Sequence, residues 1–253
     1  MNWRGILAIY QFEMSRTRRT IMQSIISPVI STTLYFVVFG AAIGARMENV
    51  ENIEYGAFIV PGLMMLTVLT QAVSNGAFGI YFPKFTGTIF ELLSAPISFT
   101  EATLGYVGAA ATKAIIIGLM VLLTAFAFAP LDIQHPILMV VILLSTAITF
   151  AMLGFIIGIW ASNFEQLQLV PLLVITPLVF LGGSFYSIEM LPEPWQTISH
   201  FNPVFYLISG FRYAFFGQAE VAIFRSLAAI AAFFLLELWV VARIFKTGYK
   251  LRK

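Results

Sequence analysis

The sequence contains very few charged residues for its length. Only 10% of its 253 residues are charged, whereas 60% are hydrophobic. Ordinary soluble domains contain about 25% charged and about 45 to 50% apolar residues. So small a polar fraction cannot cover the water-facing surface of a chain of this size, which excludes a soluble globular protein. We therefore expect lipid to be the solvent for most of the chain.

The sequence also lacks the residues and motifs of most catalytic and metal sites. It has no cysteine, which excludes disulfides, zinc–thiolate sites and thiol nucleophiles, and its two histidines, His135 and His200, are too few for a His-rich metal site. No Gly-Lys pair occurs, so the phosphate-binding loop G-x-x-x-x-G-K-[ST] is absent. We therefore expect no catalytic residue, no metal and no bound cofactor in this chain.

Long hydrophobic runs are what the sequence has instead. Residues 21–44 carry no charge and would span about 36 Å as a helix, enough to cross a hydrocarbon core of about 30 Å. This run is longer than the apolar region of a cleavable signal peptide, about 7 to 15 residues. Similar runs follow at 55–80, 105–129, 136–160, 168–187 and 222–245. The sequence predicts an all-α integral membrane protein in which residues 21–253 form one six-span domain.

The distribution of Lys and Arg predicts the orientation, because short cytoplasmic loops are rich in these residues. Six spans place both termini on the same side. Three basic residues, Arg46, Arg212 and Arg225, fall on the opposite side. Ten fall on the side of the termini: Arg4, Arg16, Arg18, Arg19, Lys84, Arg243, Lys246, Lys250, Arg252 and Lys253. Both termini are therefore predicted to be cytoplasmic.

Residues 1–20 precede the first span and have a helical apolar stripe. Arg4, Gln11, Ser15 and Arg18 fall on other faces of the helix. The stripe consists of Trp3, Ile6, Leu7, Tyr10 and Met14. This pattern predicts an amphipathic helix that lies in the inner headgroup region. The alternative, a basic tail that only sets the topology, leaves the stripe unexplained.

The segment 181–217 does not fit a simple loop between two spans. Prolines divide it, and Asn202 before Pro203 marks a break between two short helices. Because the second half is too apolar to lie in water, we expect a helical hairpin that dips into the outer leaflet. The alternative is a plain extracellular loop. For Arg212 we favour contacts with backbone carbonyls over contacts with an anionic substrate.

The predicted cytoplasmic loop 81–104 is longer than a simple connection, which needs about 2 to 8 residues. It contains a short apolar and acidic helix, predicted from Thr88 to Leu93, and Pro96, which ends it. Ser98 and Glu101 form a capping pair for the next helix. The loop therefore resembles a docking element, although its apolar side chains could instead lie in the inner headgroups.

Two charges fall within predicted spans, where charged side chains are rare and usually functional. Lys113 and Glu237 each lie about 12 Å from the cytoplasmic end of their helix. We hypothesise that they pair with each other or face a common polar cavity. In the alternative, Lys113 extends to the inner headgroups on its long stem. The pairs Gly40/Gly44 and Gly154/Gly158 have the G-x-x-x-G spacing of close helix contacts.

Two motifs carry a resemblance to a known family. The first is G-T-x-x-E-L-L-x-x-P-x-S, which begins at Gly87, and the second runs from Gly182 to Tyr213 as G-G-x-F-Y-S, L-P and N-P-x-x-Y-x-I-S-G-x-R-Y. The chain resembles ABC-2 type permeases, the membrane subunits of one class of ATP-binding-cassette (ABC) exporters, and within them the YadH-type and NodJ-like bacterial branch. The resemblance covers essentially the whole chain.

This resemblance implies a type V exporter-like fold and transport that is driven by a separate ATPase. Two permeases would pair around a pathway in the bacterial inner membrane, and two copies of a separate ATPase subunit would bind ATP and Mg and drive them. No nucleic acid would be involved. The coupling helix would use Gly87, Thr88, Ile89, Glu91, Leu92, Leu93 and Pro96. The outer hairpin would close the pathway with Gly182, Gly183, Phe185, Tyr186, Pro192, Asn202, Pro203 and Arg212.

The cargo that the resemblance favours is an amphipathic or lipid-linked compound. The alternative function is an ATP-independent secondary transporter or channel, a class that often contains internal inverted repeats. No such repeat is visible in the sequence, and the long cytoplasmic loop would then have no role.

Overall fold

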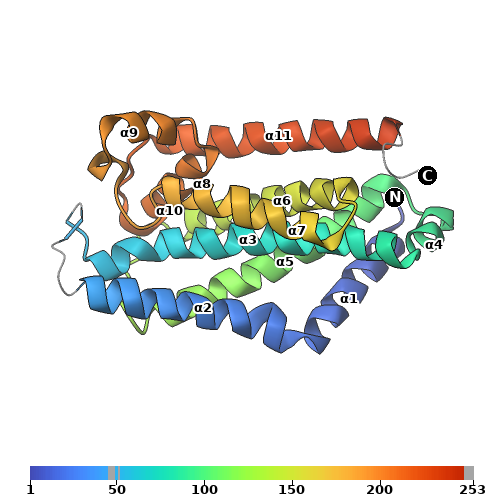
Figure 1. The fold of residues 1–253 in the computed structure, drawn as a ribbon, viewed down its shortest axis with the longest axis horizontal. Helices are drawn as coiled ribbons and strands as arrows, with labels where there is room; N and C mark the ends of the chain where they lie inside the picture. The colour runs from blue at the N-terminus through green and yellow to red at the C-terminus, as the bar shows by residue number, and fades with distance from the viewer. Residues whose placement is uncertain (45–48, 51, 248–253) are drawn as a thin grey trace.

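The protein is an elongated bundle of helices. The structure, a computed structural model, describes residues 1–44, 49–50 and 52–247. Within these residues it contains helices and one isolated bridge between Val50 and Ile53 (Figure 1). Arg46, Lys250, Arg252 and Lys253, which the prediction of orientation used, lie outside the described residues.

Six helical runs are long and apolar enough to cross a membrane, as the sequence predicts: Met22–Gly40, Tyr55–Thr86, Phe99–Ala125, Pro136–Trp160, Phe164–Leu181 and Ile223–Thr247. Four of them are single helices: α3 (Tyr55–Thr86), α5 (Phe99–Ala125), α6 (Pro136–Trp160) and α11 (Ile223–Thr247). The first run joins η1 (Met22–Ile26), α2 (Ser27–Tyr35) and η2 (Phe36–Ile43), and the fifth joins α7 (Phe164–Val170), η4 (Pro171–Ile175) and α8 (Thr176–Leu181).

Some boundaries differ from the prediction for local reasons. Helix α3 continues past residue 80 until Gly87, whose positive φ of 81° ends it. Helix α5 begins early because Ser98 and Glu101 form a complete capping box, which confirms the predicted capping pair. The connection between the two spans is therefore shorter than the predicted loop 81–104 and contains one short helix, α4 (Ile89–Ser94).

Helix α3 lies at the centre of the bundle. In its most apolar stretch 89% of the residues are buried, against 11% in the first span, 22% in the fifth and 17% in α11. It packs mainly on α6 and α5. Figure 1 shows α11 on one side of this core and the first span on the other. The first, fifth and last spans therefore leave wide faces uncovered within a single chain.

Small residues allow α3 and α6 to approach closely. A Cβ atom added to Gly154 would lie 2.2 Å from the carbonyl oxygen of Val73, and one on Gly158 would lie 2.3 Å from that of Ala77. The Gly154/Gly158 pair therefore has the role that its spacing suggests. The Gly40/Gly44 pair lies near the start of α3 but less tightly, since the nearest atoms of α3 to an added Cβ are 3.9 Å away at Gly40 and 3.5 Å away at Gly44.

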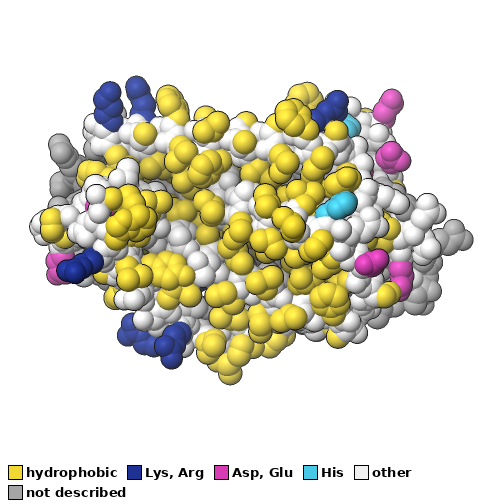
Figure 2. Space-filling view, turned by 180° about the vertical axis from the view of Figure 1, so that it is seen from behind, with side chains coloured by type: hydrophobic (Ala, Val, Ile, Leu, Met, Phe, Trp, Pro, Cys, Tyr) yellow, Lys and Arg dark blue, Asp and Glu magenta, His cyan; other side chains and the backbone are white. Residues whose placement is uncertain are grey.

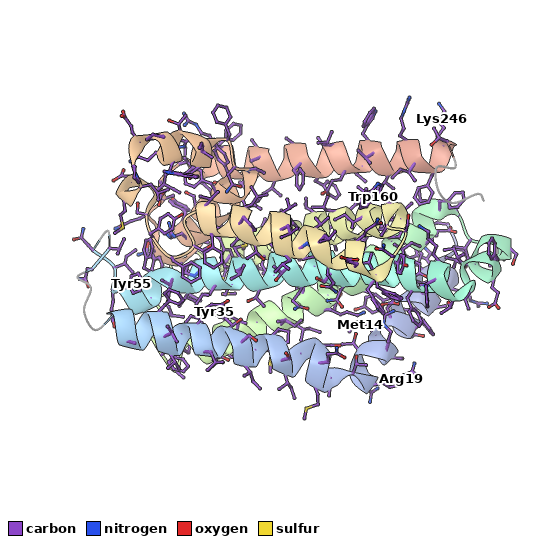
Figure 3. All side chains as sticks on the ribbon, viewed as in Figure 1. Met14, Arg19, Tyr35, Tyr55, Trp160 and Lys246 are labelled. Atoms are coloured by element: carbon purple, nitrogen blue, oxygen red, sulfur yellow. The ribbon has the colours of Figure 1, made fainter. Side chains whose placement is uncertain are left out.

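The two ends of the bundle differ in composition. The start of α1 (Trp3–Arg19), α4 and the C-terminal end of α11 lie at one end, while α9 (Glu193–His200) and α10 (Pro203–Phe216) lie at the other (Figure 1). Figure 2 shows a wide apolar band between the ends, with most visible Lys and Arg side chains at the α4 end. Arg19 and Lys246 project away from the bundle in that half of the molecule (Figure 3). This band supports a multi-pass membrane protein.

Candidate functional site

One face of helix α4 is exposed, and the other packs against the hydrophobic core. We call the end of the bundle where this helix lies the α4 end. Ile89 is 7% exposed and belongs to the main hydrophobic core, whereas Phe90 is 62% exposed. Glu91 is exposed in the first turn of the helix, and Leu92 packs partly against the core. Phe90 and Glu91 are therefore exposed on a helix whose opposite face packs against the rest of the protein.

The polypeptide on both sides of α4 is fixed by hydrogen bonds. Thr88 bonds through its hydroxyl to the hydroxyl of Thr86 at 2.9 Å. After the helix, the carbonyl of Pro96 accepts a hydrogen bond from the side chain of Asn2. Glu101 accepts hydrogen bonds from the backbone nitrogens of Ser98 and Asn2. The start of α1, the α4 segment and the start of α5 are thereby joined as one unit.

Helix α1 packs on the bundle mainly through a face beside its apolar stripe. The buried positions are Gly5, Ile9, Glu13 and Thr17, which follow each other at intervals of four and face α5. Trp3 and Leu7 of the stripe are 68% and 53% exposed. The rest of the stripe, Ile6, Tyr10 and Met14, is half-buried, and the hydroxyl of Tyr10 donates to that of Thr112 in α5. Only the edge of the stripe with Trp3 and Leu7 is therefore left available to lipid headgroups.

The buried face of α1 carries a charge cluster that the sequence analysis missed. Glu13 is only 1% exposed and lies 2.9 Å from Nζ of Lys113 in α5 and 2.7 Å from the guanidinium of Arg16. The guanidinium also lies 4.7 Å from the centre of the Phe78 ring. Burial lowers the pKa of Arg16, and its neighbour Glu13 opposes this shift.

The hypothesis that Lys113 pairs with Glu237 is wrong. Lys113 binds Glu13, and neither carboxylate oxygen of Glu237 has a hydrogen-bond partner among the described residues, although Glu237 is only 3% exposed. The reason is helix rotation, which hydropathy does not determine. A sequence signal for the true partner existed, because Glu13 is the only acidic residue before residue 48 and falls four residues after Ile9.

A polar cavity adjoins the charge cluster. It has a volume of about 330 Å³ and is bounded by α1, η1, α3, α5 and α7, with lining residues that include Arg16, Gln23, Gln71, Asn75, Lys113 and Gln168. We call it the inner polar cavity. In α3 it coincides with the half-buried positions 71, 74, 75 and 78, which interrupt a largely buried helix.

The hairpin at the opposite end is held together by Arg212, which is 1% exposed. The guanidinium donates to the carbonyl of Gly183 at 2.5 Å and to the carboxylate of Glu220 at 3.0 Å. It also lies 4.0 Å from the centre of the Phe58 ring at the start of α3. Arg212 therefore makes the kind of backbone contact that the sequence analysis favoured.

The break predicted at Asn202 and Pro203 separates α9 from α10. The side chain of Asn202 donates to the carbonyl of Leu178 at 2.6 Å and accepts from the backbone nitrogen of Val204. The other predicted hairpin residues also lie in this region. Pro192 precedes α9, and Gly183 has a positive φ of 81°.

Phe185 is 7% exposed, and the hydroxyl of Tyr186 donates to the carbonyl of Phe180. Gly182 lies close to α10, since an added Cβ would be 3.0 Å from Ile208.

The geometry of the spans, the α4 segment and the hairpin agrees with comparisons to known proteins. The family model of the ABC-2 type transporter matches residues 4–216. The chain is 38% identical over 231 residues to the inner membrane transport permease YadH of Escherichia coli K12, which covers 91% of this chain and 90% of that protein.

More distant relatives also match most of the chain. Nodulation protein J of Rhizobium leguminosarum bv. viciae is 26% identical over 86% of this chain and 83% of its own length. Nodulation protein J of Neorhizobium galegae is 23% identical over 95% of this chain and 91% of its own length.

The chain is a membrane-embedded transport subunit, and it belongs to the ABC-2 type transporter family. It is a multi-pass inner membrane permease, the membrane subunit of an ABC exporter, and such a permease is not itself the catalytic component. The alternative of an ATP-independent transporter is thereby set aside.

Proposed function

We propose that two copies of this chain form the export pathway and that each copy is driven by its own ATPase subunit. That subunit would bind ATP and Mg, and its nucleotide-dependent movement would enter the permease through α4. The observation that carries this proposal is the geometry of α4, with Ile89 buried and Phe90 and Glu91 exposed. An exposed aromatic beside a carboxylate suits a protein groove better than bulk water.

The hydrogen bonds around α4 give a route for such a movement. Glu101 links the start of α5 to Asn2, so a displacement of α4 would carry α1 and α5 with it. Helix α1 is in turn bound to α5 by the ion pair between Glu13 and Lys113. The elements that bound the inner polar cavity would therefore move with the coupling helix.

The exposed face of the first span supports a homodimer. Polar side chains occur at every fourth position of the first span, and all are exposed: Gln23, Ser27, Ser31 and Tyr35. A polar row along a spanning helix is poorly suited to lipid, whereas it suits a pathway shared by two copies. The outward face of α11 has no such row in its middle turns, which suits contact with lipid.

The charge distribution supports a cytoplasmic location for the α4 end. Among the described residues, Arg4 in the first turn of α1, Lys84 in the last turn of α3 and Arg243 near the end of α11 belong to segments at this end of the molecule. Loops rich in Lys and Arg stay in the cytoplasm, where the ATPase and its ATP are found. The hairpin of α9 and α10 would then close the pathway on the outside.

Co-purification with the ATPase tests the coupling proposal. The tagged full-length chain is co-expressed with the ABC ATPase encoded nearest to its gene, purified in detergent and reconstituted into liposomes. Phe90→Ala combined with Glu91→Arg should reduce recovery of the ATPase at least about tenfold, because both exposed contacts are changed. ATP hydrolysis per purified permease should fall in proportion.

Phe201→Ala is the matched control, because Phe201 is also highly exposed, at 84%, but lies near the hairpin at the other end. It should leave ATPase recovery unchanged. If the double variant at α4 kept full ATPase recovery and ATP hydrolysis, α4 would not be the coupling element. Size measurements of the wild-type complex should give two permeases and two ATPases.

A further inference from the structure

The wall of the inner polar cavity carries an excess of one positive charge. Arg16 and Lys113 contribute two cations, and both pair with the single carboxylate of Glu13. The other described residues that line the cavity are uncharged. Because α1, α3 and α5 exclude water from much of the cluster, this excess charge attracts an anion more strongly than it would in bulk water.

The chemistry of the wall suits an oxygen anion. A guanidinium presents several N–H donors in one plane, which matches the oxygens of a phosphate or carboxylate. Arg16 is held in place by Glu13 and by the Phe78 ring. Gln71 and Asn75 on α3 and Gln168 on α7 add uncharged donors and acceptors, which suit the polar atoms that surround such an anion.

The elements beside the cavity suit an apolar chain attached to that anion. The cavity includes Gln23 and Ser24 at the start of the first span. From there an exposed apolar row continues along the span, toward the other end of the molecule, at Met22, Ile26, Ile30 and Leu34. It runs beside the exposed polar row that begins at Gln23. A compound with an anionic head and an apolar tail matches both rows at once.

We propose that the inner polar cavity binds the phosphate or carboxylate head of an amphipathic compound from the inner leaflet, with Arg16 as the main anion contact. This inference rests on the proposed function, since it names the chemical class of the exported compound. Glu13 and Lys113 act as positioning residues: Glu13 orients Arg16, and Lys113 supplies the second cation that keeps the cluster positively charged.

The absence of cysteine allows a direct test of the charge in the cavity. Ser74→Cys places a single thiol in the cavity wall, and Ser94→Cys places one on exposed α4 as a control. The full-length chain in nanodiscs is treated with sulfonatoethyl or trimethylammonioethyl methanethiosulfonate. The anionic reagent should modify Ser74→Cys at least about fivefold faster than the cationic one, after normalisation to Ser94→Cys.

Variants of Arg16 separate charge from structure. Arg16→Gln in the Ser74→Cys background leaves Glu13 and Lys113 as a neutral pair, so the preference for the anionic reagent should disappear. Arg16→Lys retains the charge and should restore most of it. An equal rate for both reagents in the unaltered cavity would overturn the proposal. So would a thiol that reacts with neither reagent while Ser94→Cys reacts, because another protein segment would then fill the cavity.

Ligand protection tests the chemical class. Dihexanoyl phosphatidic acid, dihexanoyl phosphatidylcholine and inorganic phosphate are compared below micellar concentrations. Phosphatidic acid should slow modification of Ser74→Cys at concentrations at least about tenfold lower than either of the others, and Arg16→Gln should remove this difference. Equal protection by phosphatidylcholine would overturn the anion assignment. Equal protection by inorganic phosphate would overturn the requirement for an apolar tail.

The two proposals fail in distinguishable ways. Arg16 lies outside α4, so Arg16→Gln should still recover the ATPase at the wild-type level. If the cavity showed no preference for the anionic reagent while ATPase recovery stayed normal, only the ligand assignment would be overturned. If the wild-type protein transported without the ATPase, the proposed function would be overturned, whatever the cavity binds.

Discussion

Nζ of Lys113 lies 2.9 Å from a carboxylate oxygen of Glu13, a residue one hundred positions earlier in the chain. Both side chains are only 2% exposed. This ion pair fixes α1 to α5 in the half of the bundle that contains α4. Helix α1 also supplies a charge to the wall of the inner polar cavity through Arg16.

Removal of the Glu13 carboxylate should destabilise the protein. Glu13→Ala leaves two cations close together without a counter-charge, and loss of one partner of a buried ion pair costs about 3 to 5 kcal/mol. Thermal unfolding of the detergent-purified chain should show a clearly lower midpoint. Arg18→Gln, an exposed charge change on the same helix, should leave the midpoint unchanged. An unchanged midpoint in Glu13→Ala would contradict the pairing.

Charge reversal should identify Glu13, not Glu237, as the partner of Lys113. Lys113→Glu places two carboxylates together and should abolish ATP-dependent export of the proposed amphipathic compound from proteoliposomes. Glu13→Lys in the same chain should restore part of it, since opposite charges meet again, whereas Glu237→Lys should restore none. Rescue by Glu237→Lys alone would show that the carboxyl of Glu237 reaches Lys113 in the working transporter.

Arg212 should be essential for the order of the outer hairpin. Arg212→Gln removes the cation that joins Gly183 and Glu220 and leaves the Glu220 carboxylate without this counter-charge, at a cost of about 3 to 5 kcal/mol. Hydrogen exchange over residues 183–221 should become faster, and that in α5 should not change. Arg225→Gln is the control, because Arg225 is exposed at the same end. Unaltered exchange in Arg212→Gln would mean that other contacts hold the hairpin.

The close approach of α3 and α6 should not tolerate a methyl group. The Cβ of Gly154→Ala would lie 2.2 Å from the carbonyl oxygen of Val73, so the helices must separate, at a cost of about 1 to 3 kcal/mol. The midpoint of thermal unfolding should fall. Gly108→Ala has its nearest atom at 3.9 Å and should leave the midpoint unchanged. Equal midpoints for both variants would show that the interface yields easily.

Hydropathy and local sequence signals determined the membrane spans and several helix boundaries of this protein. The apolar runs predict all six spans because each run must satisfy its backbone inside the membrane, and only a helix of sufficient length does so. Ser98 with Glu101 predicts the start of α5, and Asn202 with Pro203 predicts the break in the hairpin, because capping and proline geometry act over a few residues. The two motifs also indicate the family.

Only the tertiary structure decided which side chains meet. Hydropathy does not set the rotation of a helix such as α3, in which apolar residues cover most of the circumference, so the half-buried row that contains Gln71 and Asn75 had no assigned direction. The apolar stripe of α1 is an ordinary amphipathic signal, yet the helix packs mainly through a neighbouring face, on which Gly5 allows close contact with Ile97. That packing places Glu13 beside Lys113, so Lys113 does not pair with Glu237. The choice of partner depends on contacts between α1 and α5, which are about one hundred residues apart in the sequence.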